Sequence, residues 1–353
     1  MSRIFVLGAG QLGAMLHYSG LPLNLQVVPV DFDAEPIADL ADSDLVTAEI
    51  ERWPDTPVTR QLAAHPNFIN AKVFGLMADR LSQKATLDEL QIATSPWQSL
   101  ERDTDVASLL EQLGSPCLLK RRTGGYDGRG QLWLDSPDTD LSDWQGAAIA
   151  EQKIPFDEEV SIIGVRNASG EMHFYPLALN LHLNGILRAS LVGLERLQAL
   201  QAEAEAMLGR LMKHLDYCGV MAMELFRVGD KLLVNEVAPR VHNSGHWSLS
   251  GSSVSQFEWH LRATAGLPLA PAQVKGACLM INLIGSERNE AWLSVPAVEL
   301  WWYGKSVRPG RKLGHLNTCA AVPADLSTQV QALRPLLEED YQSVLDWVEK
   351  RIS

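Results

Sequence analysis

The sequence has few cysteines, no excess of positive charge and no long hydrophobic run. Its four cysteines in 353 residues are far apart and form no CxxC pair, which argues against the disulfide framework of a small secreted protein. The formal net charge of −13 argues against a nucleic-acid partner, because phosphate backbones are held by an excess of Lys and Arg. No apolar stretch approaches the roughly 20 residues that cross a bilayer, so we expect no membrane partner.

The first residues, MSRIFVLGAG, lead directly into an apolar strand pattern. They do not combine a basic segment, a long apolar segment and a small-residue cleavage site, as a secretory leader would. Together with the isolated cysteines, this pattern predicts a cytoplasmic protein in a reducing compartment.

The first hundred residues alternate short apolar segments with helical patterns. We expect strands at residues 4–7, 26–30 and 45–48, and helices from Gln11 and around residues 59–65. This alternation is typical of a parallel sheet in an α/β domain. The pattern therefore predicts an N-terminal α/β domain over residues 1–97.

The rest of the chain divides into a small lid and a larger α+β part. Residues 98–158 contain an expected helix at 106–113 and strands at 117–120 and 131–134. Beyond residue 160 strands dominate, including 277–284 and 298–303, and are interrupted by a helical stretch at 195–215 rich in good helix formers. A last helical region is expected from about residue 330. We expect a lid domain over 98–158 and a C-terminal domain over 159–353.

A glycine-rich turn follows the first expected strand. The segment GAGQLG at residues 8–13 matches GxGxxG, and Asp31 closes the next strand, as in a dinucleotide site. Backbone N–H groups at a helix N-terminus suit any phosphate, however. The turn alone is compatible with NAD, with another phosphate ligand or with a purely structural role.

A second glycine-rich segment, KRRTGGYDGRGQ at residues 120–131, follows an apolar strand that ends at Lys120. Its glycines let backbone N–H groups converge on phosphate oxygens while the lysine supplies a point charge, although the spacing is not that of a Walker A loop. We expect a phosphate-covering loop, and a surface hairpin is the alternative.

Glu224 and Glu236 lie on the two expected strands of a hairpin that turns at residues 229–231. A three-residue turn pairs residues whose numbers have the same sum, so the two glutamates face each other with Cβ atoms about 5 Å apart. Two such carboxylates repel unless a proton or cation lies between them, and oxygen ligands favour Mg²⁺. The alternative, an exposed pair on a solvated face, is disfavoured by the apolar residues around them.

Two further segments combine positive charge with small residues. The segment APRVHNSGH at residues 238–246 continues from the second glutamate strand and is expected to form an anion pocket. A loop at residues 305–315 surrounds a Pro-Gly turn with Lys305, Arg308, Arg311, Lys312 and His315. In an acidic protein this loop suits a phosphate monoester, and a solvated basic turn is the alternative.

These segments occur together with DAEP at 33–36 and TAEIE at 47–51. In this combination, over essentially its whole length, the chain resembles the N5-carboxyaminoimidazole ribonucleotide synthetases, ATP-dependent carboxylating ligases of microbial purine biosynthesis. The resemblance implies an ATP-grasp fold of α/β and α+β class. Such a fold has a biotin-carboxylase-like N-terminal α/β domain, a small lid domain and a C-terminal α+β domain.

The resemblance also implies an ATP site between the lid and the C-terminal domain. Arg80 and Lys120 would contact the phosphates, residues 125–131 would cover them, residues 151–154 would form the adenine hinge, and Glu159 would hold the ribose. The implied ATP-binding residues are Arg80, Lys120, Gly125, Tyr126, Asp127, Gly128, Arg129, Gly130, Gln131, Glu151, Gln152, Lys153, Ile154, Glu159, Asn235 and Glu236. Glu224 and Glu236 would be the Mg²⁺ ligands.

For the ribonucleotide substrate, the resemblance implies a second set of residues at the other end of the site. Lys305 and Arg311 would lie near its phosphate, and Arg240 occupies the place of a bicarbonate-binding arginine in biotin carboxylase. The substrate-binding set is Gly10, Gln11, Leu12, Arg240, His242, Asn243, Lys305 and Arg311. The implied catalytic residues are Arg240, Lys120, Lys305 and Arg311.

The implied reaction joins bicarbonate to the exocyclic amine of 5-aminoimidazole ribonucleotide and converts ATP to ADP and phosphate through carboxyphosphate. Lys and Arg donors with a metal would stabilise charge on the transferred phosphoryl group. A mobile lid would keep water out. The family further implies a homodimer in the cytoplasm.

Two alternatives stay open at this point. A formate-dependent glycinamide ribonucleotide transformylase would share the architecture, although YDGRGQ and HNSGH disfavour it. An NAD-dependent oxidoreductase would use residues 8–13 but would leave the glutamate pair and the lid loop without a purpose. One departure concerns Ala238, since many ATP-grasp enzymes have an Asn ligand at this position. The nearby Asn235 is expected on the opposite face of its strand.

Overall fold

The computed structural model describes residues 3–125 and 129–352. Near the N-terminus, three parallel strands form a sheet of order β2-β1-β3, with β1 (Arg3–Leu7), β2 (Gln26–Val30) and β3 (Leu45–Ala48). Helices α1 (Gln11–Gly20) and α2 (Pro57–Ala63) follow β1 and β3. Apolar strand residues such as Phe5, Leu7 and Val46 are buried against α2 and the next helix. The predicted parallel α/β arrangement is therefore confirmed.

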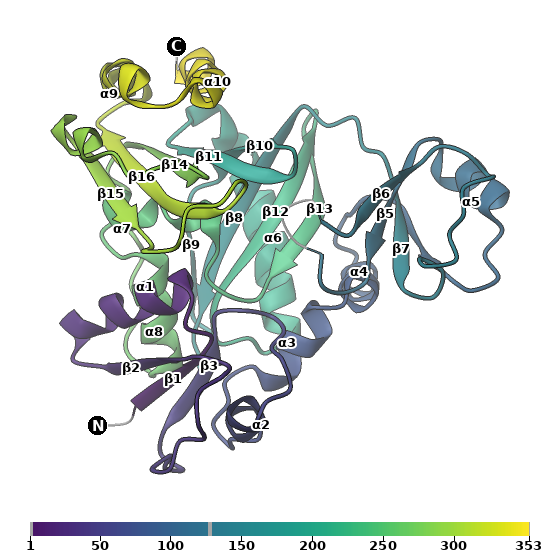
Figure 1. Ribbon diagram of the computed structural model, residues 1–353, viewed down its shortest axis with the longest axis horizontal. Helices are drawn as coiled ribbons and strands as arrows, with labels where there is room; N and C mark the ends of the chain where they lie inside the picture. Colours follow the sequence, from purple (N-terminus) through teal and green to yellow (C-terminus); the bar gives the residue numbers. More distant parts are fainter. Residues whose placement is uncertain (1–2, 126–128, 353) are drawn as a thin grey trace.

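The lid is a four-stranded antiparallel sheet of order β4-β7-β5-β6. Its strands are β4 (Trp97–Leu100), β5 (Cys117–Arg121), β6 (Gln131–Leu134) and β7 (Ala148–Gln152), with α5 (Val106–Leu113) packed on it. Two helices, α3 (Ala71–Met77) and α4 (Arg80–Glu89), connect it to the N-terminal sheet. Figure 1 shows the lid projecting to one side of the rest of the molecule.

The largest sheet has the order β13-β12-β8-β10-β11-β14-β16-β15, and β9 pairs with β8. Its strands are β8 (Glu158–Arg166), β9 (Met172–Phe174), β10 (Ala178–Leu183), β11 (Ile186–Val192), β12 (Gly219–Val228), β13 (Lys231–Ala238), β14 (Ala277–Ile284), β15 (Val298–Trp302) and β16 (Lys312–Ala320). The helices that follow or interrupt these strands are α6 (Gln198–His214), α7 (Ser248–Gly251), α8 (Gln256–Thr264), α9 (Leu326–Leu333) and α10 (Gln342–Ile352).

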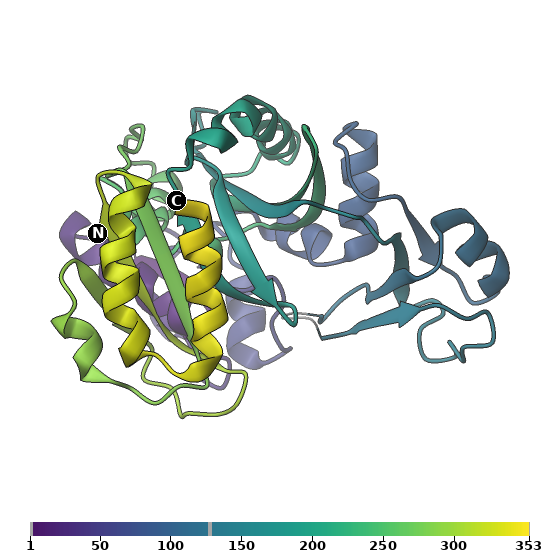
Figure 2. The ribbon, with the colours of Figure 1, turned by 90° about the horizontal axis from the view of Figure 1, so that it is seen from above.

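Each face of the large sheet has its own core, because successive strand residues point to opposite faces. Ile162 belongs to the cluster with α6, α9 and α10, whereas Ile163 belongs to the cluster with α1 and α8. Figure 2 shows α9 and α10 side by side over the sheet. Packing of α1 onto α8 joins the N-terminal sheet to the C-terminal part of the chain. The three predicted domain limits remain predictions.

The hairpin between β12 and β13 has a different turn from the predicted one. Val228 pairs with Lys231, so the turn has two residues, Gly229 and Asp230, and the prediction of a three-residue turn is wrong. A β-bulge next to Glu224 then shifts the register by one residue. Since a bulge places two residues opposite one, the shift restores the predicted pairing of Glu224 with Glu236.

Candidate active site

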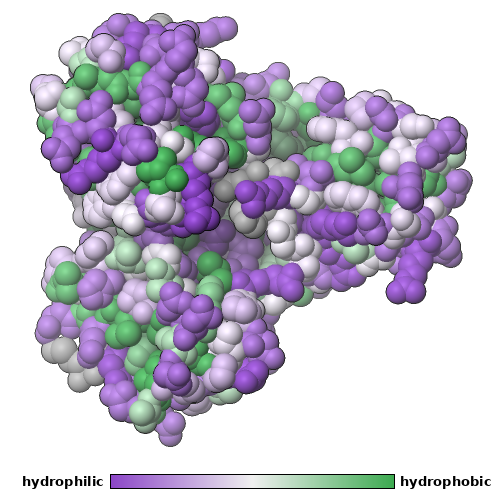
Figure 3. Space-filling model, in the orientation of Figure 1, coloured by the Kyte–Doolittle hydropathy of each residue, from purple (hydrophilic) through white to green (hydrophobic). Residues whose placement is uncertain are grey.

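A cleft of about 1050 Å³ opens where the N-terminal sheet, the lid and the large sheet meet. Figure 3 shows the molecule hollowed at this place, with hydrophilic residues around the hollow. Of the predicted site residues, those that line the cleft are Gln11, Leu12, Arg80, Lys120, Gly125, Gln131, Glu159, Glu224, Asn235, Glu236, Arg240, His242 and Asn243. The fold therefore brings predicted residues from all three parts of the chain to one place.

The bulge in β13 also determines where Asn235 points. Its Oδ1 accepts a hydrogen bond from Lys120 Nζ at 3.0 Å, and both Asn235 and Glu236 line the cleft. The expectation that Asn235 lies on the opposite strand face is therefore wrong, because a bulge turns two successive side chains toward one side. Ala238 lines the cleft as well but supplies no side-chain oxygen.

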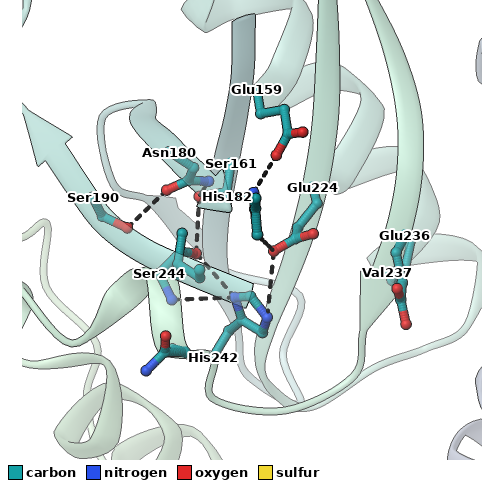
Figure 4. Close-up of polar contacts among 12 residues, drawn as sticks. Glu159, Ser161, Asn180, His182, Ser190, Glu224, Glu236, Val237, His242 and Ser244 are labelled. Atoms are coloured by element: carbon teal, nitrogen blue, oxygen red, sulfur yellow. Dashed lines mark hydrogen bonds and ion pairs between the residues drawn. The ribbon is translucent and has the colours of Figure 1, made fainter. Parts of the chain in front are cut away.

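Glu224 lies between two histidines (Figure 4). Its Oε1 is 3.6 Å from His242 Nε2 and 3.8 Å from His182 Nε2, and His182 Nδ1 forms an ion pair with Glu159. Burial raises the pKa of Glu224, and the nearby charges of Glu236 and Glu159 raise it further, although His182 opposes this. A cation beside this pair of opposed carboxylates would relieve their repulsion.

His182 on β10 lies between two carboxylates. Burial alone would lower its pKa, but the hydrogen bond with Glu159 and the charge of Glu224 outweigh burial, so the pKa of His182 is raised. His182 was not among the predicted site residues, although the Asn184-Gly185 turn after β10 is a local signal for a hairpin. Only the antiparallel pairing of β10 with β8 brings His182 next to Glu159.

Lys120 is held by a buried group of charges. Its Nζ donates to Glu151 Oε2 at 3.0 Å, and Lys84 Nζ lies 3.4 Å from Glu151 Oε1. Burial raises the pKa of Glu151, but Lys120, Lys84 and a hydrogen bond from Ser95 lower it more, to about 2. Burial lowers the pKa of Lys84 to about 8. Glu151 therefore stays ionised and orients Lys120 toward the cleft.

The other predicted adenine-hinge residues follow Glu151 along the chain. Gln152 donates its backbone N–H to Pro96 O at 2.8 Å, Lys153 Nζ lies 5.6 Å from the centre of the Trp133 ring, and Ile154 O accepts from Phe156 N at 3.0 Å. None of Gln152, Lys153 and Ile154 is among the described residues that line the cleft. The hinge role remains a prediction.

Arg80 links the lid loop to the glutamate pair. It is the first residue of α4, and its guanidinium donates to Gly125 O at 3.2 Å and lies 3.3 Å from Glu236 Oε1. A Cβ at Gly125 would lie 2.8 Å from Arg129 O, so this turn requires glycine. Gly130 and Gln131 lead from the loop into β6. The predicted loop residues Tyr126, Asp127 and Gly128 lie outside the described residues.

The first glycine turn is filled by a carboxylate of the same chain. Gly10 N donates to Glu49 Oε1, and Gly13 N donates to Glu49 Oε2 at 2.5 Å. Because Glu49 uses the N–H groups that would bind a pyrophosphate, the turn is not an open dinucleotide site. Gly10 therefore faces Glu49, whereas Gln11 and Leu12 line the cleft.

Lys305 and Arg311 lie beside this end of the cleft. Lys305 Nζ donates to Gln11 Oε1, and Arg311 Nη1 donates to Ser306 Oγ at 2.7 Å. Burial lowers the pKa of Lys305, and the positive charge of Arg311 lowers it further, although Glu49 opposes this. A phosphate near these cations would relieve their repulsion.

The residues after β13 are held by side chains from other elements. Arg240 Nη2 lies 3.0 Å from Glu51 Oε1, and the amide of Asn243 donates to Asn282 Oδ1 at 3.0 Å. His242 caps a short 3₁₀ turn (Asn243–Gly245) through its ring nitrogen. These contacts orient the predicted substrate-binding side chains toward the cleft.

Two family models match the chain, the ATP-grasp domain over residues 85–257 and the phosphoribosylaminoimidazole carboxylase C-terminal domain over residues 278–329. Relatives named N5-carboxyaminoimidazole ribonucleotide synthase share 51% identity in Haemophilus influenzae and 49% in Escherichia coli. Both alignments cover 99% of this chain, with 97% and 99% of the relatives. The chain belongs to the N5-carboxyaminoimidazole ribonucleotide synthase family.

Solved structures of the family agree with this fold. The N5-carboxyaminoimidazole ribonucleotide synthetase of Thermus thermophilus has a TM-score of 0.84 at 39% identity, covering 95% of this chain and 99% of that chain. The Aspergillus clavatus N5-carboxyaminoimidazole synthase, in complex with ADP and 5-aminoimidazole ribonucleotide, has a TM-score of 0.81 at 28% identity, covering 95% and 98%. The predicted ATP-grasp fold class is confirmed.

Membership in this family confirms that the chain is an ATP-dependent ligase. It decides against the NAD-dependent oxidoreductase, in agreement with the filled glycine turn. Across residues 3–125 and 129–352, no helix combines the length and apolarity that a membrane span requires.

Proposed function

We propose that the chain joins bicarbonate to the exocyclic amine of 5-aminoimidazole ribonucleotide, with conversion of ATP to ADP and phosphate, in de novo purine biosynthesis. The observation that carries this proposal is the single cleft in which Lys120, the Glu224 and Glu236 pair, and Arg240 with His242 meet. The Aspergillus clavatus relative, crystallised with ADP and 5-aminoimidazole ribonucleotide, supports the same pair of ligands.

At the lid end, ATP would lie between β5 and the hairpin of β12 and β13. Lys120 supplies positive charge beside Asn235, and Arg80 supplies positive charge beside Glu236. Their present partners are amide and carboxylate oxygens, and phosphate oxygens would accept hydrogen bonds from the same donors. The loop at residues 125–131 would cover the phosphates, and Glu159 would accept hydrogen bonds from the ribose hydroxyls.

Glu224 and Glu236 are suited to hold Mg²⁺ with the ATP phosphates. They are opposed in register, and their mutual repulsion contributes to the raised pKa of Glu224. No cluster of three or more His, Cys, Asp or Glu side chains suits a metal in the part of the chain that the structure describes. The phosphates would therefore complete the oxygen ligands. A bound Mg²⁺ would neutralise charge that develops on the transferred phosphoryl group.

At the opposite end, the ribonucleotide phosphate would lie near Lys305 and Arg311, with Gln11 as a neighbour. The imidazole would then extend toward Arg240 and His242, where the amine meets the carboxyl donor. Arg240 is paired with Glu51 at 3.0 Å. A bicarbonate held by Arg240 would share this guanidinium with Glu51.

Bicarbonate is a poor electrophile, so it must be activated before the amine attacks. Attack of a bicarbonate oxygen on the γ-phosphoryl group would give carboxyphosphate, and Lys120 and Arg80 would stabilise the developing charge. Carboxyphosphate, or CO₂ released from it, is then captured by the amine. Closure of the lid loop over the cleft would exclude water from this step.

A homodimer in the cytoplasm belongs to the same proposal and is supported by the family resemblance. Size-exclusion chromatography with light scattering tests the dimer, which would have about twice the chain mass of 38.9 kDa. A mass equal to that of one chain at micromolar concentration would contradict the dimer without affecting the proposed reaction.

The reaction is tested by phosphate release from ATP with Mg²⁺ and bicarbonate, with and without 5-aminoimidazole ribonucleotide. We expect strong stimulation by the ribonucleotide and formation of its carboxylated product. If glycinamide ribonucleotide with formate stimulated turnover instead, the result would support the proposed ATP site and contradict the proposed substrate.

A further inference from the structure

A buried row of small polar side chains leads to His242 on the side away from Glu224 (Figure 4). Ser190 Oγ donates to Asn180 Oδ1 at 2.8 Å, Asn180 Nδ2 donates to Ser161 Oγ at 3.0 Å, and Ser161 Oγ donates to Ser244 Oγ at 2.9 Å. The three serines are at most 1% exposed. We call Ser190, Asn180, Ser161 and Ser244 the polar relay.

The direction of this relay is fixed where it reaches His242. The backbone N–H of Ser244 points at His242 Nδ1 at 3.3 Å, and the Ser244 hydroxyl lies 2.9 Å from the same nitrogen. A backbone N–H can only donate, so Nδ1 must present a lone pair and carry no proton. The Ser244 hydroxyl, which accepts from Ser161, therefore also donates to Nδ1.

The opposite direction is excluded by the same backbone group. If the Asn180 amide were rotated and every hydroxyl reversed, His242 Nδ1 would have to donate to Ser244. Its proton would then compete with the Ser244 N–H for one position, which leaves two donors facing each other. The hydrogen-bond pattern therefore defines one tautomer of the ring.

An imidazole without a proton on Nδ1 carries its proton on Nε2. In this structure Nε2 faces the cleft, 3.6 Å from Glu224 Oε1. His242 thus presents an N–H group, and no lone pair, to whatever binds beside Glu224.

We propose that Ser244 is a positioning residue that locks His242 as its Nε2–H tautomer, so that His242 is a hydrogen-bond donor in the reaction and not the base for the amine. This proposal rests on the proposed function. The N–H would hold an oxygen of bicarbonate or of its phosphorylated form. As the amine forms its bond to the carboxyl carbon and the carbon–oxygen bond to phosphate breaks, the released phosphate would take the amine proton.

The tautomer can be measured directly on the full chain labelled with ¹⁵N-histidine. Two-bond proton–nitrogen correlation spectra distinguish a protonated ring nitrogen from an unprotonated one, and the signals of His242 are those absent from the His242→Gln variant. We expect unprotonated Nδ1 and protonated Nε2. A protonated Nδ1 would overturn the proposal. This measurement needs no substrate, so it remains informative if the proposed function fails.

Turnover of two variants at His242 separates a donor from a base. The amide of His242→Gln can donate a hydrogen bond where Nε2–H does, but it cannot take up a proton, and His242→Ala can do neither. We expect His242→Gln to keep kcat within about 10-fold of the unmodified chain, and His242→Ala to lose about 100-fold or more. Equal losses in two folded variants would contradict the donor role.

Ser244→Ala tests the lock itself, with Ser190→Ala as the matched control at the far end of the polar relay. Ser244→Ala removes the hydroxyl that donates to Nδ1 but keeps the backbone N–H. We expect Nδ1 to stay unprotonated while the ring loses one of its two bonds, with about a 10-fold lower kcat and an unchanged KM for ATP. Ser190→Ala should leave the tautomer intact and kcat within about twofold. Thermal melting checks that both variants fold. If Ser244→Ala kept full kcat, the Ser244 hydroxyl would not position His242, and a protonated Nδ1 in this variant would contradict the role of the backbone N–H.

Discussion

The two ends of the cleft hold their positive charges in different ways. At the lid end, Lys120 pairs with Glu151 and Arg80 with Glu236. At the other end, Lys305 donates to the neutral amide of Gln11, and Arg311 donates to Ser306. A cation that contacts a neutral group can bind a phosphate without breaking an ion pair. The proposed ribonucleotide end can therefore bind an anion directly, whereas at the proposed ATP end the cations would have to exchange or share their carboxylate partners.

The largest effect is expected at the lid end, on stability. Glu151→Gln removes the carboxylate between Lys84 and Lys120 and leaves two buried ammonium groups without it. Loss of one partner from a buried charge group costs about 3–5 kcal/mol. Urea unfolding measures this, with Glu203→Gln on the exposed side of α6 as the control, expected within about 0.5 kcal/mol. Equal stabilities of the two variants would refute the structural role of Glu151.

The same carboxylate predicts a pH dependence. The pKa of Glu151 is about 2 in the folded chain, against an ordinary value of 4.5, so between these values the unfolded chain binds more protons. Its stabilisation, about 3 kcal/mol, is present above pH 4.5 and is lost as the pH falls toward 2. The urea-unfolding free energy should therefore fall more steeply below pH 4.5 in the unmodified chain than in Glu151→Gln. Parallel pH profiles would show that Glu151 does not contribute this slope.

Glu224→Gln tests the metal site between the two ends. Loss of one of the two proposed carboxylate ligands should lower kcat by about 100-fold or more, the scale seen when a group that stabilises transition-state charge is removed. The apparent requirement for Mg²⁺ should also rise. Phosphate release measured over a range of Mg²⁺ concentrations gives both kcat and the Mg²⁺ concentration required for half-maximal activity. An unaltered rate would rule out Glu224 as a metal ligand.

Lys120→Met should act on ATP alone. Glu151 keeps its contact with Lys84 at 3.4 Å, so the fold should persist while KM for ATP rises about 30-fold, equivalent to about 2 kcal/mol. Steady-state phosphate release at varied ATP and at varied ribonucleotide concentration measures KM for each substrate separately. An equal rise in KM for the ribonucleotide would contradict the proposal that ATP and the ribonucleotide bind at separate ends of the cleft.

Lys305→Met should give the smallest effect and the opposite selectivity. KM for 5-aminoimidazole ribonucleotide should rise about 10-fold, or about 1.4 kcal/mol, with KM for ATP unchanged. Arg308→Met is the matched control, since Arg308 is an exposed cation of the same loop, and it should change either constant less than about twofold. If both variants behaved alike, net loop charge and not Lys305 would bind the phosphate.

Sequence reasoning was most successful where function requires a local pattern. The glycine-rich lid segment, the basic loop and the opposed glutamates are recognisable from spacing, because turns and strand pairing depend on neighbouring residues. Even there, the predicted turn was one residue too long, and the bulge beside Glu224 compensated for it. The roles assigned to the individual site residues remain predictions.

By itself, the sequence determined the strand and helix order, the family resemblance and 13 of the residues that line the cleft. Only the tertiary structure decided which partners the buried charged side chains have. Glu49 accepts hydrogen bonds from the glycine turn, Lys84 lies beside Glu151, and His182 lies between Glu159 and Glu224. These partners come from strands and helices distant in sequence, so no local spacing encodes them. Their energies also depend on burial, which exists only once the elements are packed.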